Sequence, residues 1–496
     1  MSDLLSFYKS RFSLLDDKEM IQAILQGEAI DTHTSLSLIR NCEDMVIETP
    51  QMMLAFYRNL LHVVLMLSLS QKKDRSRLFR AKNLLKKGEI EGYWHSFPLS
   101  RAFFALSSYL VTGTHVELDA EQLERERMFF EFGHHSVDSD VIRPIESVYL
   151  SLSWLYLGVV SRNETLIRAA LKLTSFCMHF CDKTGALFQG LWTKEWDYCP
   201  SILYSALFLL FSVTSCLFYN EKMLEMKSLL FQRLQEVQKN RVDLLILLFE
   251  IGFQRLIEGK PSYPNFSSDL VCHDIDVSLG FMRYTFQDLH LACTACGVNT
   301  GLGAVHKHAI HIVSFGPHFY PLSDPRYFGI YRTSNGSKEG FKDLAIQHGE
   351  ERCRFQGWVR LISPLLDDRS KQCFSSVRPG RQWVFFDMRV EGADIQLNVR
   401  LNQCLQTFPL AFVFFVSADK VHLGEGRELL PRSLEKYQGC ATTLTLEKEG
   451  KSCLLCPQFM GEMEVIPLEG QGHFWSADFL IAFPLTQALT LYSWKF

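Results

Sequence analysis

Proline and glycine are distributed unevenly along the 496-residue chain, and this distribution constrains the fold more than any other feature. Residues 1–250 hold 4 of the 16 prolines and 8 of the 29 glycines, and residues 251–496 hold the rest. Helix interiors exclude both residue types, whereas turns between strands need them. The first half is therefore predicted to be helical, and the second half to consist mostly of strands.

Apolar residues in the first half recur at intervals of three and four, the period of an amphipathic helix. The pattern is clear over 53–65 and again over 148–159, and charged breaks such as 72–75 separate such stretches. Successive long helices joined by short loops pack as pairs, either in a bundle or in a closed ring.

The second half shows strand patterns instead. Residues 394–401 alternate strictly between polar and apolar, so their apolar side chains share one face. The runs 411–416 and 479–483 are continuously apolar, which favours strands covered on both faces. These patterns predict an α+β, multidomain chain: a helical domain over 1–260, a linker over 261–275 and a large antiparallel β-sandwich over 276–496.

Composition excludes several classes of protein. With 47% hydrophobic and 21% charged residues, the chain is not intrinsically disordered. The 51 basic residues do not exceed the 55 acidic ones, so no nucleic-acid partner is expected. Fourteen cysteines are too few for a disulfide scaffold. The N-terminus lacks the order of a cleaved secretory signal, so we expect a cytoplasmic protein, or one exported without a cleaved signal.

One uncharged run, 199–220, is long enough to cross a membrane. Serines and threonines interrupt it, and only the single charges Lys194 and Lys222 flank it. We interpret it as a helix buried on all sides and expect no transmembrane segment.

Histidines are concentrated in one segment, where His306, His308, His311 and His318 lie within thirteen residues. If this segment is one continuous strand, His306 and His308 share a face and His311 lies on the other. Two imidazoles on one face can bind a metal or share proton transfer. A solvated strand rich in histidine is the alternative interpretation.

Two Cys-x-x-Cys pairs are a weaker metal candidate. Their long separation and the apolar residues within the second pair favour buried free thiols, so no cofactor is expected. The candidate zinc ligands would be Cys293, Cys296, Cys453 and Cys456, or His306 and His308.

Aromatic residues cluster with polar ones at 93–101 and at 192–198. Exposed tryptophan rings stack on sugar rings and neighbouring acids accept hydroxyl hydrogen bonds, so these clusters indicate a carbohydrate cleft. Aromatic residues that merely fill helix contacts are the alternative. The candidate substrate-binding residues are His95, Trp192, Glu195 and Trp196.

Three stretches resemble the heparinase II/III-type polysaccharide lyases. Residues 95–101 are similar to that family's early helix with its arginine. Residues 182–207 resemble its aspartate–glycine turn and the following helix with a catalytic tyrosine, here Tyr204. Residues 306–325 are similar to its His-x-His-Ala, Ser-Phe and Asp-Pro strand pair. The resemblance implies an α/α toroid joined to a β-sandwich.

The resemblance also implies β-elimination on a uronic-acid-containing polymer. Such a reaction needs a group that neutralises the carboxylate, a base for the α-proton and an acid for the leaving oxygen. The resemblance makes Tyr204 the base or acid, His306 or His308 its partner, and Arg101 the carboxylate neutraliser. The expected partner is an acidic or other polysaccharide.

One difference from the family leaves a second class of function as an alternative to the enzyme. The family's asparagine or histidine in the central toroid helix would fall near Ile145 and Glu146, and neither type stands there. A glutamate would oppose enolate formation. The alternative is a catalytically degenerate scaffold that binds a glycan or a protein. A glycosidase using Glu195 and Asp197 ranks last, because two acids on one face of an extended segment lie too close together.

Overall fold

The computed structural model describes residues 32–496 apart from a set of segments. These segments are 47–49, 70–74, 92–97, 115–143, 193–198, 238–242, 259–269, 271–272, 278–279, 296–300, 320–340, 363–378, 403–409, 441, 469–474, 476 and 487–489.

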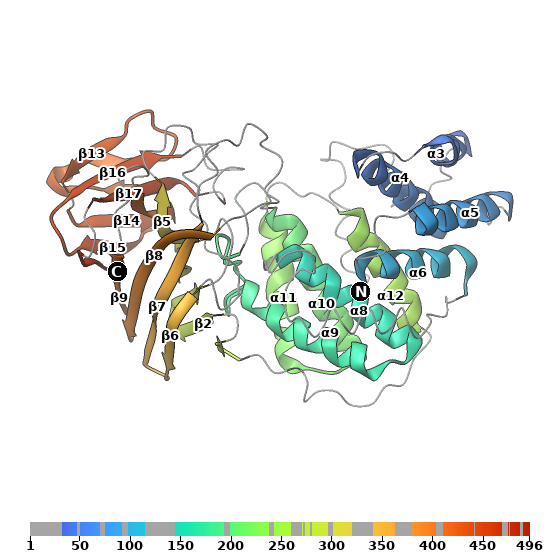
Figure 1. Ribbon diagram of the computed structural model, residues 1–496, viewed down its shortest axis with the longest axis horizontal. Coiled ribbons are helices and arrows are strands. Elements are labelled where there is room, and N and C mark those ends of the chain that lie inside the picture. Colours follow the sequence, from blue (N-terminus) through green and yellow to red (C-terminus); the bar gives the residue numbers. More distant parts are fainter. Residues whose placement is uncertain are drawn as a thin grey trace. The chain divides into compact units, whose positions relative to one another are not determined.

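Helices occupy the first half of the chain, as the proline and glycine distribution predicts (Figure 1). They are α3 (Thr32–Asp44), α4 (Pro50–Leu69), α5 (Arg75–Glu91), α6 (Pro98–Thr112), α8 (Pro144–Ser161), α9 (Glu164–Cys177), the 3₁₀-helix η3 (Met178–Phe180), α10 (Pro200–Leu217), α11 (Glu221–Glu236) and α12 (Leu244–Glu258).

The few prolines of this half mark where helices begin. Pro50, Pro98, Pro144 and Pro200 are each the first residue of a helix. Proline is well tolerated there, because its missing N–H would have no partner within the helix and its fixed φ already suits helical geometry. The prolines therefore punctuate the helical half without breaking any helix interior.

Helix α10 is the uncharged run of the sequence, and its side chains are largely buried. Three of its serine hydroxyls find partners within the helix: Ser205, Ser212 and Ser215 donate to carbonyls four residues earlier, at 2.7, 2.6 and 2.6 Å. Among the described helices, only α10 is long and apolar enough to cross a membrane, and 72% of it is buried inside the protein. This burial agrees with the predicted core helix. The last helix, α12, packs against α10 and also against the early helices α4 and α6.

Strands dominate the second half. The first group is β1 (Ile275–Asp276), β2 (Phe281–Phe286), β3 (Leu289–Thr294), β4 (Gly303–Lys307), β5 (Ile310–Phe319), β6 (Phe341–His348), β7 (Arg352–Ile362), β8 (Pro379–Glu391) and β9 (Asp394–Leu401). The second group is β10 (Leu410–Ser417), β11 (Lys420–His422), β12 (Glu428–Leu429), β13 (Tyr437–Cys440), β14 (Leu444–Lys448), β15 (Lys451–Pro457), β16 (Glu462–Pro467), β17 (Phe479–Leu485) and β18 (Tyr492–Lys495), with the 3₁₀-helix η7 (Gly424–Gly426) before β12.

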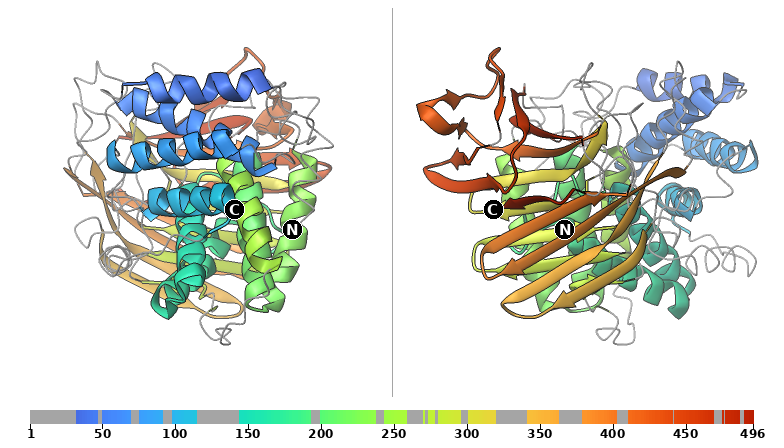
Figure 2. Two further views of the ribbon diagram at one scale, coloured as in Figure 1. Left: turned by 90° about the vertical axis from the view of Figure 1, so that its right-hand side faces the viewer. Right: turned by 60° about the vertical axis from the view of Figure 1, so that its left-hand side comes forward.

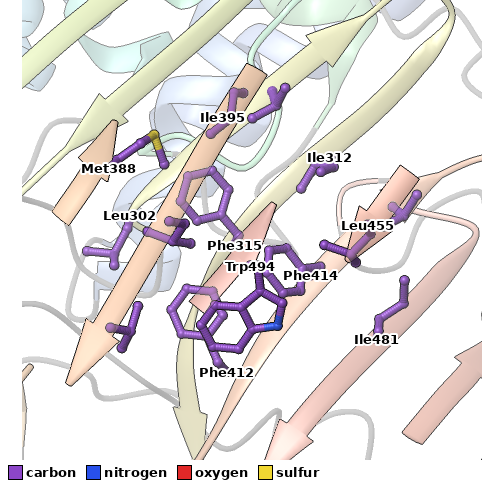
Figure 3. Close-up of a cluster of buried hydrophobic side chains, with 14 of the residues drawn as sticks. Leu302, Ile312, Phe315, Met388, Ile395, Phe412, Phe414, Leu455, Ile481 and Trp494 are labelled. Atoms are coloured by element: carbon purple, nitrogen blue, oxygen red, sulfur yellow. The ribbon is translucent and has the colours of Figure 1, made fainter. Parts of the chain in front are cut away.

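The described strands form two antiparallel sheets of nine strands each. The first has the order β1-β2-β3-β4-β5-β10-β17-β16-β13, and the second β12-β11-β14-β15-β18-β9-β8-β7-β6. One large apolar core contains side chains of both sheets, so they pack as a sandwich. Figure 3 shows part of this core, where Phe412 and Trp494 stack with ring centroids 4.6 Å apart.

The burial of individual strands confirms the patterns in the sequence. In β9, the alternating apolar residues 395–401 all enter the sandwich core. In β10, Phe412 and Phe414 enter that core, while Val413 and Phe415 pack in a second apolar cluster on the other face of the sheet. A continuously apolar strand is thus covered on both sides, as predicted.

The chain divides into two compact units. The described residues within 1–178 and 199–272 form a helical unit, and those within 179–198 and 273–496 form a β unit. The segment after α9 therefore belongs with the strands, although it lies between helices in the sequence. Most of the predicted linker, 261–275, lies outside the described residues.

Candidate active site

A tight turn in the β unit positions one buried carboxylate. The Oδ1 atom of Asp182 accepts the backbone N–H of Thr184 at 2.7 Å and that of Ala186 at 3.0 Å. It also accepts the Thr184 hydroxyl at 2.7 Å. Gly185 has φ of 79°, a backbone conformation that glycine adopts without steric cost. The sequence Asp-Lys-Thr-Gly therefore folds into a turn that fixes the carboxyl group.

The second oxygen of this carboxyl group contacts a histidine that is 124 residues away in the sequence. His306 Nδ1 lies 2.8 Å from Asp182 Oδ2, and both side chains are only 2% exposed. An ionised carboxylate can only accept, so Nδ1 carries the proton. The other ring nitrogen of His306, Nε2, is buried and has no hydrogen-bond partner among the described residues. In the neutral ring this atom carries the lone pair.

The pKa of Asp182 reflects this arrangement. Burial favours the neutral acid and would raise the pKa of the carboxyl group. The hydrogen bond and attraction of His306, together with the Thr184 hydrogen bond, outweigh burial and hold the pKa well below its usual value. Asp182 is therefore ionised in the folded protein across the neutral range.

Three histidines form a row across neighbouring strands. His290 of β3 is paired with His306 of β4, which is paired with His311 of β5. The His306 and His311 rings stack with centroids 4.0 Å apart, and Phe188 stacks on His306 at 4.7 Å. Burial lowers the pKa of His290, an effect that His306 adds to and Asp182 opposes. This histidine row lies on the sheet face that points away from the sandwich core.

The segment that carries Asp182 is pinned to the same face. Gly190 donates its backbone N–H to the carbonyl of Val313 at 3.1 Å, at an irregular position of β5. A Cβ on Gly190 would lie 2.4 Å from the Cβ of Ser314, so only glycine fits this approach. Further along, Trp192 Nε1 donates to Thr294 Oγ1 at 3.0 Å. These contacts fix the distance between Asp182 and the histidine row.

The structure corrects the predicted faces of the histidine segment. The segment is a hairpin rather than one strand, with β4 ending at Lys307 and β5 beginning at Ile310. His308 therefore lies in the turn with φ of 55°, and His311 shares its face with His306. The His308 side chain is 35% exposed and its Nδ1 lies 3.1 Å from Asp288 Oδ2. The prediction that His306 and His308 share a face is wrong, because the turn interrupts the alternation.

The expected exposure of Trp192 is also wrong. Its side chain is 1% exposed, and it packs against Phe180 and Phe281 at 5.8 and 5.0 Å between ring centroids. A ring covered in this way cannot stack on a sugar. Trp192 instead holds the segment after α9 against the sheet.

The other candidates are distributed as follows. Tyr204 lies on α10 in the helical unit and is 8% exposed. Arg101 belongs to α6, and its side chain is outside the described residues. His95, Glu195 and Trp196 also lie outside the described residues. Of the predicted catalytic residues, the structure thus gives a defined environment to His306, His308 and Tyr204.

No group of three or more metal-binding side chains is found within the part of the chain that the structure describes. Cys293 and Cys453 are both buried, and burial raises the pKa of each thiol, which disfavours the thiolate that zinc requires. Cys296 lies outside the described residues, and Cys456 is partly exposed on β15.

Asp182 is not among the site residues predicted from the sequence. Its signal was the Asp-x-x-Gly spacing of residues 182–185, which suggests a turn but names no partner. Its role becomes apparent only from the contact with His306.

Comparisons with known proteins give a faint likeness to lyases. No family model matches the chain, and no curated protein matches it. Among solved structures, a chondroitinase AC lyase determined with oligosaccharides aligns over 96% of this chain and 82% of its own, with 8% identity and a TM-score of 0.36. A mutant chondroitin AC lyase of Streptomyces coelicolor A3 aligns over 99% and 82%, with 10% identity and a TM-score of 0.34. Likeness at this level identifies neither a family nor a site residue.

Proposed function

We propose that the chain is a glycan-acting protein with the architecture of a polysaccharide lyase, and that it performs β-elimination on a uronic-acid-containing polymer. The observation that carries the proposal is the hydrogen bond between His306 and Asp182. These residues come from two separate stretches of the lyase resemblance, and the fold brings them to 2.8 Å. The helical unit would then correspond to the α/α toroid of the heparinase II/III type.

The pair suits proton transfer. Asp182 holds the proton of His306 on Nδ1, which leaves Nε2 as the atom that can take up or release a proton. In the proposed reaction, Tyr204 or His306 removes the proton beside the uronate carboxylate, and the other protonates the leaving oxygen. Arg101 would neutralise the carboxylate. Asp182 acts as a positioning residue, because it touches His306 and not the substrate.

The experiment is to mix the protein with a panel of acidic polysaccharides and follow the unsaturated uronate by its ultraviolet absorption. Tyr204→Phe removes one hydroxyl, and Tyr219→Phe is a control in a tyrosine that is 68% exposed. We expect product from the parent and the control, and a loss of about 10²–10⁴-fold in Tyr204→Phe. Product formation at the parent rate by Tyr204→Phe would exclude the assigned role.

A second function is favoured by the burial of the assigned groups. His306 is 2% and Tyr204 is 8% exposed, which leaves little of either side chain for a polymer to reach. The alternative is therefore a scaffold without catalytic activity that acts as a glycan-binding or protein-interaction module. In that case no polymer yields product, and Trp196→Ala weakens glycan retention because stacking area is lost. Absence of both product and retention across the panel would leave the protein-interaction scaffold.

A further inference from the structure

The strands β6 to β9 carry a row of cations and aromatic rings on the face that points away from the sandwich core. Lys342, Trp358, Phe385 and Arg400 are consecutive cross-strand partners on these four strands. Figure 2 shows the four strands side by side in its right-hand view. Lys342 is exposed and the other three are partly exposed. Three strand spacings separate the two ends of this row, about 14 Å.

The cations lie close to the rings. Lys342 Nζ is 5.7 Å from the ring centroid of Trp358 and 4.7 Å from that of Trp383. The Arg400 guanidinium is 5.5 Å from Trp358 and 5.4 Å from Phe385. Cation–π contacts of this kind hold the charged groups in place over the sheet. The result is a flat surface in which two fixed positive charges flank partly exposed rings.

These two cations lack a counter-charge within the described part of the chain. Elsewhere on the same face, Arg354 and Arg389 share the carboxylate of Asp387. In contrast, no described carboxylate lies within ion-pair distance of Lys342 or Arg400, and the Nε atom of Arg400 has no hydrogen-bond partner among the described residues. Unneutralised cations on one surface attract an anionic partner.

We propose that the row from Lys342 to Arg400 binds an anionic polysaccharide, with its acidic groups on the cations and its sugar rings on Trp358 and Phe385. The inference rests on the proposed function only for the choice of a glycan among polyanions. Arginine matches carboxylate or sulfate groups in a bidentate manner, and aromatic rings offer flat apolar faces. This surface is separate from the buried histidine row, which lies on the other sheet.

The experiment measures the affinity of the full chain for heparin at about 50 mM and about 200 mM salt. The test variant is Lys342→Gln with Arg400→Gln. The control is Lys82→Gln with Lys86→Gln, which removes two exposed charges from α5. We expect the test variant to bind at least about tenfold more weakly and with a smaller salt dependence, since it loses two charge-assisted contacts. Phe385→Leu, which keeps an apolar side chain but removes the ring, should weaken binding by a smaller factor.

Parent-like heparin binding by the test variant, an equal loss in the control, or no binding by the parent protein would overturn the proposal. Single-stranded DNA of equal charge that binds this row as tightly as heparin would overturn the choice of a glycan. The ultraviolet assay for product is run on the same protein samples with the full panel of acidic polysaccharides. If binding depends on Lys342 and Arg400 but no product forms, the binding surface is supported and the lyase reaction is refuted. If product forms but binding does not depend on these two residues, the lyase reaction is supported and the binding surface is refuted.

Discussion

The two charged faces of the β unit differ in how their charges are satisfied. On the first sheet, Asp182 and His306 are 2% exposed and are hydrogen-bonded to each other. On the second sheet, Lys342 is exposed and Arg400 partly exposed, and their described neighbours are aromatic rings. The charge of the buried carboxylate is matched within the chain by its hydrogen-bond donors, whereas the exposed row offers charge to something outside it.

This difference separates stability from binding. A buried carboxylate with several donors around it is costly to disrupt, because each donor that loses its acceptor stays desolvated. Exposed cations contribute little to folding, since water and salt screen them. Substitutions of the Asp182–His306 pair should therefore lower the free energy of unfolding, and substitutions of Lys342 and Arg400 should change what the protein binds with little loss of stability.

The largest effect is expected for Asp182→Ala. This change removes the acceptor of His306 Nδ1–H, of two backbone N–H groups and of the Thr184 hydroxyl. We expect the free energy of unfolding to fall by about 3–5 kcal/mol. Urea denaturation followed by circular dichroism measures it.

The matched control is Asp288→Asn, which changes an aspartate that also contacts a histidine but is 68% exposed. Its effect should stay within about 0.5 kcal/mol. If both variants lose the same stability, the comparison between a complete buried pair and an exposed one fails.

The second prediction concerns acid. The folded-state pKa of Asp182 lies below the unfolded value of about 3.9, so its stabilisation is complete above that value. As the pH falls below about 4, the unfolded state takes up the proton first, and this stabilisation is lost as the pH nears the folded pKa. Asp182→Asn keeps an acceptor for the turn but no charge, so its stability should fall less steeply with acid. Asp387 titrates in the same direction, so only the difference between parent and variant reports Asp182.

The third prediction is smaller and concerns how the Asp182 segment is attached. Gly190→Ala places a Cβ 2.5 Å from the Val313 carbonyl oxygen, so the segment must shift away from the sheet. We expect a loss of about 1–3 kcal/mol in the free energy of unfolding. Gly349→Ala is the control, since its new Cβ would be no closer than 3.4 Å to its neighbours. A parent-like Gly190→Ala protein would mean that the segment does not depend on this close approach.

Regular patterns in the sequence predicted the fold well. The strict alternation of 394–401 placed four apolar side chains in the core, because a strand with one face in the sandwich must alternate. The uneven distribution of proline and glycine separated helices from strands for a similarly local reason. Each proline of the first half begins a helix, so none contradicts the helical prediction.

The candidate site was less predictable, because its geometry comes from contacts that are distant in sequence. Nothing local indicates that Asp182 meets His306 across 124 residues. The hairpin turn was missed because His308 takes a positive φ without the glycine or asparagine that usually marks such a turn. Trp192 was misjudged because its burial depends on the docking of its segment to the sheet.

The smallest effect on stability is expected for the double variant Lys342→Gln with Arg400→Gln. Both side chains lose cation–π contacts at positions reached by solvent, which are worth little there, so the free energy of unfolding should fall by less than about 1 kcal/mol in total. Urea denaturation of this variant beside Asp182→Ala tests the contrast directly. A loss as large as that of Asp182→Ala would show that the two cations support the fold, and weaker heparin binding by this variant would then reflect unfolding. A small loss would let its heparin affinity be interpreted as a property of the surface alone.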